Sequence, residues 1–194
     1  RHIQGGDMRE AQRLQTNAVE VATLLTLPAA AALAICAPAF VTAFFVGGKM
    51  TLANGAIMAN IVVALVCGLP AYVLVKVFQP AFFSREDTRT PVWSAAGTLA
   101  VNIALNFYVV PRYGIVGLAA ATAFTATLNT AVLYAVLQWR GWFRFTAKLG
   151  GRIARQLIAT GVMSAALWLL MPPLAPYFGG SVIARVLSLT VLVG

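Results

Sequence analysis

Long uncharged stretches alternate with short polar connections along the whole chain. A helix needs about 20 predominantly apolar residues to cross the roughly 30 Å hydrocarbon layer of a bilayer. Five of the stretches are long enough to cross, and a sixth begins near the end of the sequence. They cover about residues 18–46, 54–83, 91–110, 114–138, 153–174 and 182–194. The pattern therefore predicts a bundle of membrane-crossing helices.

Composition points to the same class of protein. The chain is 60% hydrophobic and 10% charged, with a mean hydropathy of +0.84, whereas a soluble domain carries about 25% charged residues. We predict an all-α, polytopic transmembrane helix bundle over residues 1–194. The last stretch stops after 13 residues, and the chain opens on Arg1 without an initiator Met. We therefore expect a truncated piece of a longer membrane protein.

Basic residues are distributed unequally between the two sides of the predicted bundle. If the crossings alternate, ten lysines and arginines fall on one side and three, Lys49, Arg112 and Arg185, on the other. Short cytoplasmic loops carry the excess of lysine and arginine, so loops 84–90 and 139–152 are predicted to be cytoplasmic. The formal charge of +9 thus reflects orientation and attraction to anionic lipid. We expect a membrane as the partner and no nucleic acid.

Residues that could carry catalysis or bind a metal are scarce. Between positions 21 and 84 the only charged side chains are Lys49 and Lys76. Hydrolysis or group transfer would need a positioned base, paired carboxylates or a His/Asp cluster. Cys36 and Cys67 lie in separate apolar stretches with no histidine nearby, which indicates neither a disulfide framework nor a metal site. We predict no catalytic residues, no metal centre and no enzyme.

Polar side chains form stripes on two neighbouring predicted helices. Asn102 and Asn106 are four residues apart and share one helix face. Thr122, Thr125 and Asn129 follow at helical spacing on the next helix. They form interhelical hydrogen bonds or line a polar cavity or ion site, since amide and hydroxyl oxygens suit hard cations.

Four prolines lie inside predicted crossings, and each removes a backbone donor and disfavours the helical conformation just before it. We predict helix kinks at Pro28, Pro38, Pro70 and Pro80. Pro80 has no N–H to donate to the carbonyl of Lys76, four residues earlier. Lys76 itself lies about 12 Å of helix before the end of the stretch at residue 84. The ammonium either reaches partly toward the interface or faces a water-filled cavity that accepts anions. We favour the cavity.

The segment KVFQPAFFSREDTRTPV, residues 76–92, resembles the region around the tenth helix of the MurJ/MviN family, lipid II flippases of the MOP superfamily. The flanking segments LLTLPAAAAL at 24–33, FFVGGKMT at 44–51 and LNTAVLY at 128–134 are similar to the family as well. The resemblance implies the second lobe of a two-lobe alternating-access transporter whose N-terminal lobe is missing. It also implies that lipid II moves from the cytoplasmic to the periplasmic leaflet of a bacterial inner membrane.

The same resemblance implies roles for particular residues. Lys76, Gln79 and Arg1 would line a cationic cavity that receives the pyrophosphate of lipid II. Some family members have a sodium site, and by motif position its ligands here would be Asn102, Asn106, the backbone of Leu118 and Thr122. This chain has Asn106 where a carboxylate would bind the cation better, so Na⁺ and a polar coupling site without Na⁺ both stay open.

Two other functions are compatible with these residues. One is a different exporter of the MOP superfamily, carrying polysaccharide-linked lipids or drugs. The other is a membrane enzyme or scaffold subunit that acts on the same lipid. Several cavity arginines in the first lobe would distinguish a lipid II flippase from another exporter. Clusters of carboxylates or histidines in the missing half would indicate an enzyme or scaffold subunit.

Overall fold

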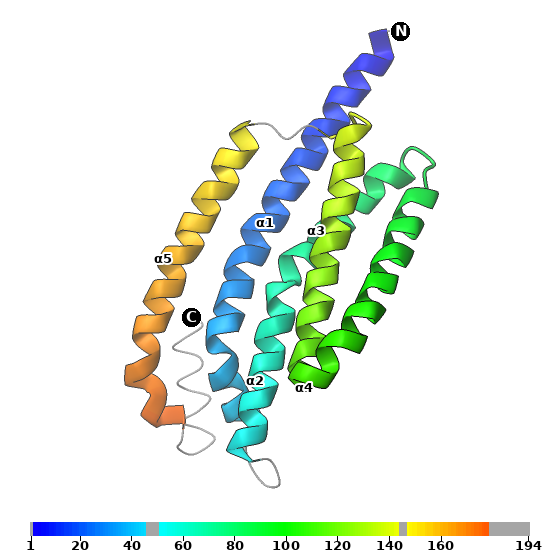
Figure 1. Ribbon diagram of the computed structural model, residues 1–194. Coiled ribbons are helices and arrows are strands. Elements are labelled where there is room, and N and C mark those ends of the chain that lie inside the picture. The colour runs from blue at the N-terminus through cyan, green and yellow to red at the C-terminus, as the bar shows by residue number, and fades with distance from the viewer. Residues whose placement is uncertain (1, 46–50, 144–146, 179–194) are drawn as a thin grey trace.

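The computed structural model describes residues 2–45, 51–143 and 147–178, and every regular element in these ranges is a helix. The helices are α1 (His2–Phe44), α2 (Leu52–Cys67), α3 (Leu69–Phe83), α4 (Arg89–Trp139) and α5 (Ala147–Phe178). They run roughly alongside one another as an elongated bundle (Figure 1). The all-α prediction is thereby confirmed.

The helix α4 is a hairpin made of two antiparallel helical halves. Its backbone leaves the helical conformation at Gly114, where φ is 61° and ψ is −145°, a region that glycine alone occupies without strain. The first half (residues 89–113) therefore folds back beside the second half (residues 115–139), as the green and yellow-green ribbons of Figure 1 show. The sequence predicts a boundary at this place, between 91–110 and 114–138.

The predicted single helix over 54–83 is divided into α2 and α3 at Gly68. The Gly68 N–H donates to the Leu65 carbonyl at 3.0 Å and closes α2. Pro70 then lies in the first turn of α3, where a backbone N–H would have no helical partner and its absence costs nothing. Gly68 lies directly against Ala123 of α4, so a side chain at position 68 would collide with that helix.

The other three prolines lie inside continuous helices. α1 runs through Pro28 and Pro38, and α3 runs through Pro80 and ends at Phe83. The Thr42 hydroxyl donates to the Pro38 carbonyl at 2.7 Å. Kinks at these three positions stay predictions, whereas the helix boundary beside Pro70 is a structural fact.

Three helical segments of the described chain are long and apolar enough to cross a membrane: Gln12–Thr42, Ala53–Phe83 and Arg89–Trp139. The third is 51 residues long and is folded in half at Gly114, so its two halves correspond to two of the predicted crossings. The crossing predicted at 153–174 lies within α5 and stays a prediction. The stretch 182–194 lies outside the described residues.

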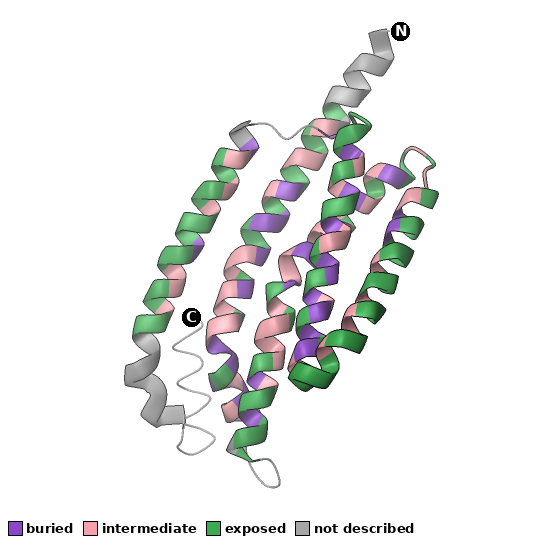
Figure 2. Ribbon diagram, viewed as in Figure 1, coloured by how far each residue is buried: buried purple, intermediate pink, exposed green. Residues whose placement is uncertain are grey.

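A compact aromatic core fills one end of the bundle. Phe82 and Leu137 are fully buried, and Phe78 packs on Tyr134 and Phe143 with ring centroids 6.2 and 6.1 Å apart. Buried residues follow the inner faces of the helices, and exposed residues follow the outer faces (Figure 2). This core therefore fixes α3 against the second half of α4 at the end where the chain turns between 84 and 88.

Candidate functional site

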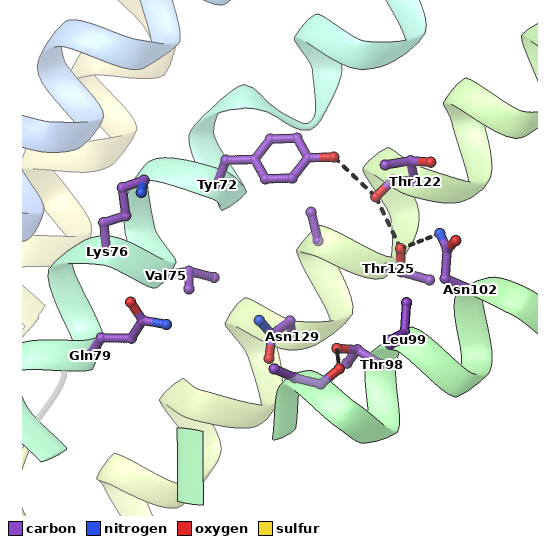
Figure 3. A pocket seen from close by; sticks show the side chains of 12 residues that line it. Tyr72, Val75, Lys76, Gln79, Thr98, Leu99, Asn102, Thr122, Thr125 and Asn129 are labelled. Carbon is purple, nitrogen blue, oxygen red and sulfur yellow. Dashed lines mark hydrogen bonds between the residues drawn. The ribbon is translucent and has the colours of Figure 1, made fainter. Parts of the chain in front are cut away.

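A polar cavity of about 460 Å³ opens between α3 and the two halves of α4. Tyr72, Lys76 and Gln79 form the α3 wall, at helical spacings of four and three that place them on one face. The facing wall carries hydroxyl and amide groups from both halves of α4 (Figure 3): Thr98, Asn102, Thr122, Thr125 and Asn129. Lys76 is the one charged residue among the described residues that line the cavity.

The side chain of Lys76 is exposed rather than enclosed. It lines the open cavity together with Gln79, one turn further along α3. We expect the ammonium to face water or an anion here, because an ammonium in hydrocarbon costs about 2.5–3.5 kcal/mol. Pro80, which has no backbone N–H to donate within the helix, lies four residues after Lys76 on α3.

The α4 wall is a ladder of side-chain hydrogen bonds. The Ser94 hydroxyl donates to Asn129 Oδ1 at 2.6 Å, and Asn102 Nδ2 donates to Thr125 Oγ1 at 2.9 Å. Asn106 Nδ2 continues the ladder by donating to Asn102 Oδ1 at 2.9 Å. The polar stripes thus join the two halves of α4, while several of the same residues line the cavity.

Tyr72 connects the two walls of the cavity. Its hydroxyl donates to the Thr122 carbonyl at 3.4 Å, which also accepts from Thr125 Oγ1 at 3.0 Å. Sequence reasoning missed Tyr72, although its position four residues before Lys76 could have indicated a shared face. It also missed Ser94, whose partner is 35 residues away in the sequence.

The structure brings most of the predicted site residues together. Lys76, Gln79, Asn102 and Thr122 line the one cavity. Asn106 lines a neighbouring hollow of about 370 Å³ beside Phe107 and Pro111. Leu118 takes part through its backbone carbonyl, which accepts from Thr122 Oγ1 at 2.8 Å, and Arg1 lies outside the described residues.

Sodium binding by Asn102, Asn106, Leu118 and Thr122 stays a prediction. The Leu118 carbonyl and Asn102 Oδ1 already accept hydrogen bonds from Thr122 and Asn106. Asn106 Oδ1 is buried without a hydrogen-bond partner among the described residues. The described residues contain no group of three His, Cys, Asp or Glu side chains that could hold a metal.

The turn that follows α3 is fastened to the end of α4. Asp87 accepts hydrogen bonds from the Thr90 hydroxyl at 2.6 Å and the Thr90 N–H at 3.1 Å, and it pairs with Arg140. The Thr90 hydroxyl and backbone N–H, together with the Arg140 guanidinium, lower the pKa of the Asp87 carboxyl below its ordinary value. The guanidinium groups of Arg85 and Arg140 lie 4.8 and 4.9 Å from the ring centroid of Trp142.

The SREDTRTP part of the 76–92 motif thus has a structural role, because it ties α3 to both ends of the α4 hairpin. Comparison with known proteins is decisive at this point: the family model described as "Lipid II flippase MurJ" matches residues 1–188. The chain belongs to the MurJ family. MurJ proteins are multi-pass membrane transporters rather than enzymes, so the alternative of a membrane enzyme is no longer supported.

Individual MurJ relatives agree with the assignment. The chain is 39% identical over 175 residues to the probable lipid II flippase MurJ of Rhizobium meliloti, covering 90% of this chain and 33% of the relative. It is 34% identical over 176 residues to the corresponding protein of Vibrio cholerae, covering 91% and 34%. The chain therefore spans about a third of the length of these curated relatives.

A solved structure shows the same fold. The structure titled "Lipid II flippase MurJ, inward closed conformation" superimposes with a TM-score of 0.76, covering 97% of this chain and 38% of that one. Sequence identity is 18%, so this likeness concerns the fold. The helices described here therefore match part of a MurJ structure.

Proposed function

We propose that this chain is the second lobe of a lipid II flippase, which moves lipid II from the cytoplasmic to the periplasmic leaflet by alternating access. The relatives are named lipid II flippases, and membership in their family favours this substrate over those of other MOP exporters. The observation that carries the proposal is the position of Lys76 on the wall of the polar cavity. An N-terminal lobe would supply the opposite side of the translocation path.

Electrostatics explains why a lysine belongs in this place. Lipid II carries a negatively charged pyrophosphate, and an ammonium in a site of low dielectric attracts it more strongly than in water. Hydrogen bonds between charged donors and phosphate oxygens are about twice as strong as neutral ones. Lys76 supplies such a donor, and Gln79 supplies a neutral amide N–H one turn away.

The proposed orientation places the turn at 84–88 and the segment 140–143 in the cytoplasm of a bacterium. Both lie at the same end of the bundle (Figure 1), where Asp87 pairs with Arg140. Arg85 and Arg89 add to the positive charge at this end, as the excess of basic residues in cytoplasmic loops requires.

Cysteine labelling tests the orientation. In the full-length protein without Cys36 and Cys67, Glu86→Cys should react with a membrane-impermeant maleimide only after the inner membrane is permeabilised. Tyr113→Cys, at the turn of the α4 hairpin, should react in intact spheroplasts. The reverse pattern would show that the proposed orientation is inverted.

Replacement of Lys76 tests the function. Lys76→Ala in the full-length protein should slow lipid II translocation in proteoliposomes by on the order of tenfold or more, because a hydrogen bond to a charged group contributes about 1.5–3 kcal/mol. Lys76→Arg should retain most of the activity. Arg112→Ala is the matched control, since its guanidinium stacks on Tyr108 at 4.0 Å and does not line the cavity.

Translocation at the wild-type rate by well-folded Lys76→Ala would contradict the proposal. Growth of a strain that depends on the variant gives an independent readout of the same activity. Equal loss in Lys76→Ala and Arg112→Ala would indicate a general effect of removing positive charge and would likewise count against a cavity role.

A further inference from the structure

We infer that the side-chain amide of Asn129 is a second anion-binding donor of the cavity and that Ser94 positions it. The inference rests on the proposed function, because it assigns a contact to the phosphate-bearing headgroup that Lys76 attracts. Asn129 and Ser94 both lie outside the family motif at 76–92, which contains Lys76 and Gln79. Ser94 follows the motif closely in the sequence.

One hydrogen bond sets that direction. The Ser94 hydroxyl donates to Asn129 Oδ1 at 2.6 Å, and an amide carries its acceptor oxygen and its NH₂ group on separate arms of a planar fork. With the oxygen held by Ser94, the NH₂ group points away from Ser94. Figure 3 shows the nitrogen of Asn129 directed across the cavity toward Gln79.

Burial makes Ser94 a firm anchor. Ser94 is 9% exposed, so its hydroxyl has little water to bond and depends on the Asn129 oxygen. Asn129 is half-buried and lines the cavity, so its nitrogen lies at the cavity surface. The pair therefore presents a donor from a rigid wall, which reduces the ordering cost when a ligand binds.

Other polar groups on the same wall are already engaged. Asn102 Nδ2 donates to Thr125, and the hydroxyl of Thr122 donates to the Leu118 carbonyl. Thr98 Oγ1 donates to the Ser94 carbonyl at 2.9 Å. Among the amide and hydroxyl groups of the α4 wall, the NH₂ of Asn129 is the donor that has no acceptor within the described residues.

The resulting cavity presents several N–H donors and no carboxylate among its described residues. Lys76 and Gln79 face it from α3, Asn129 faces it from α4, and no described carboxylate lines it. Phosphate oxygens accept such bonds, and the charge strengthens each of them. With its oxygen bonded to Ser94, the Asn129 amide presents its NH₂ group to an anionic headgroup, whereas the opposite orientation would present an oxygen and repel it.

Binding of lipid II to the detergent-solubilised full-length protein tests the inference. Asn129→Leu should weaken binding by on the order of tenfold. Asn129→Asp keeps the bond from Ser94 and nearly the same shape, so it should fold, but it should bind more weakly than Asn129→Leu because a carboxylate replaces the donor. Thr127→Ala is the matched control on the same helix, since its hydroxyl bonds the Ala123 carbonyl.

The positioning role has its own readout. Ser94→Ala should weaken binding severalfold, and Ser94→Thr, which keeps the hydroxyl, should restore it. Melting temperature without ligand is measured in parallel, because a merely structural serine would lower that temperature and leave the dissociation constant unchanged. That result would overturn the role of Ser94.

Failure of this inference differs from failure of the proposed function. If Lys76→Ala loses lipid II binding while Asn129→Leu and Asn129→Asp bind as the wild type does, the Asn129 assignment is wrong and the proposed function stands. Tighter binding by Asn129→Asp than by Asn129→Leu would show that the amide oxygen faces the ligand. Unchanged binding by Lys76→Ala would contradict the proposed function itself.

Discussion

The junction between α2 and α3 offers a test of close helix packing, through the substitution Gly68→Ala. Gly68 has φ −81° and ψ −12°, an ordinary right-handed conformation that alanine adopts without strain. A Cβ placed there would lie 2.9 Å from both Cα and Cβ of Ala123 and 3.1 Å from Cε2 of Tyr72. The first of these atoms is backbone, so relief of the clash requires a helix to move.

The size of the effect follows from two opposing contributions. Overpacking of a tight contact costs about 1–3 kcal/mol. Alanine recovers about 0.5–1 kcal/mol because it loses less backbone entropy than glycine on folding. We therefore expect Gly68→Ala to destabilise the protein by about 1–2 kcal/mol, seen as a lower melting temperature of the full-length protein in detergent.

Gly97→Ala is the matched control for this substitution. Gly97 lies in the first half of α4, and a Cβ there would meet no atom within 4 Å. Alanine should therefore stabilise the helix by about 0.5–1 kcal/mol, the opposite sign. In the Gly68→Ala background, Ala123→Gly should restore stability only in part, because the clash with the backbone at position 123 remains. A Gly68→Ala protein as stable as the wild type would refute the packing argument.

Two further substitutions test single contacts. The lowered pKa of Asp87 means that its contribution to stability is fully present above the ordinary aspartate pKa of about 3.9 and is lost as the pH falls through the lowered value. Asp87→Asn should therefore lower the melting temperature at pH 7, and its difference from the wild type should shrink below about pH 4; a difference independent of pH would contradict the role of Thr90 and Arg140. Thr130→Val removes a hydrogen bond of 2.9 Å to the Ala71 carbonyl of α3 and should cost about 0.5–1.5 kcal/mol in chemical unfolding, whereas Thr127→Val, on the exposed side of the same helix, should be close to neutral.

The sequence determined those features that depend on neighbours along the chain. Apolar runs of sufficient length specify helices, and the interruption between 91–110 and 114–138 predicts the turn of the α4 hairpin, where Gly114 has a backbone conformation that suits glycine. Lys76 was recognisable as a candidate site residue because an ammonium is costly in an apolar stretch. The motif at 76–92 was enough to indicate the family.

Tertiary structure decided how the helices face one another. Gly68 lies against Ala123, 55 positions later in the chain, and the ion pair of Asp87 joins it to a residue 53 positions away. The amide of Asn129 has a direction only because Ser94 lies opposite it. Helical periodicity fixes which residues share a face of one helix. The rotation of each helix about its axis and its shift along the bundle follow from packing between distant segments. Only that packing places Lys76, Gln79 and Asn129 around one cavity.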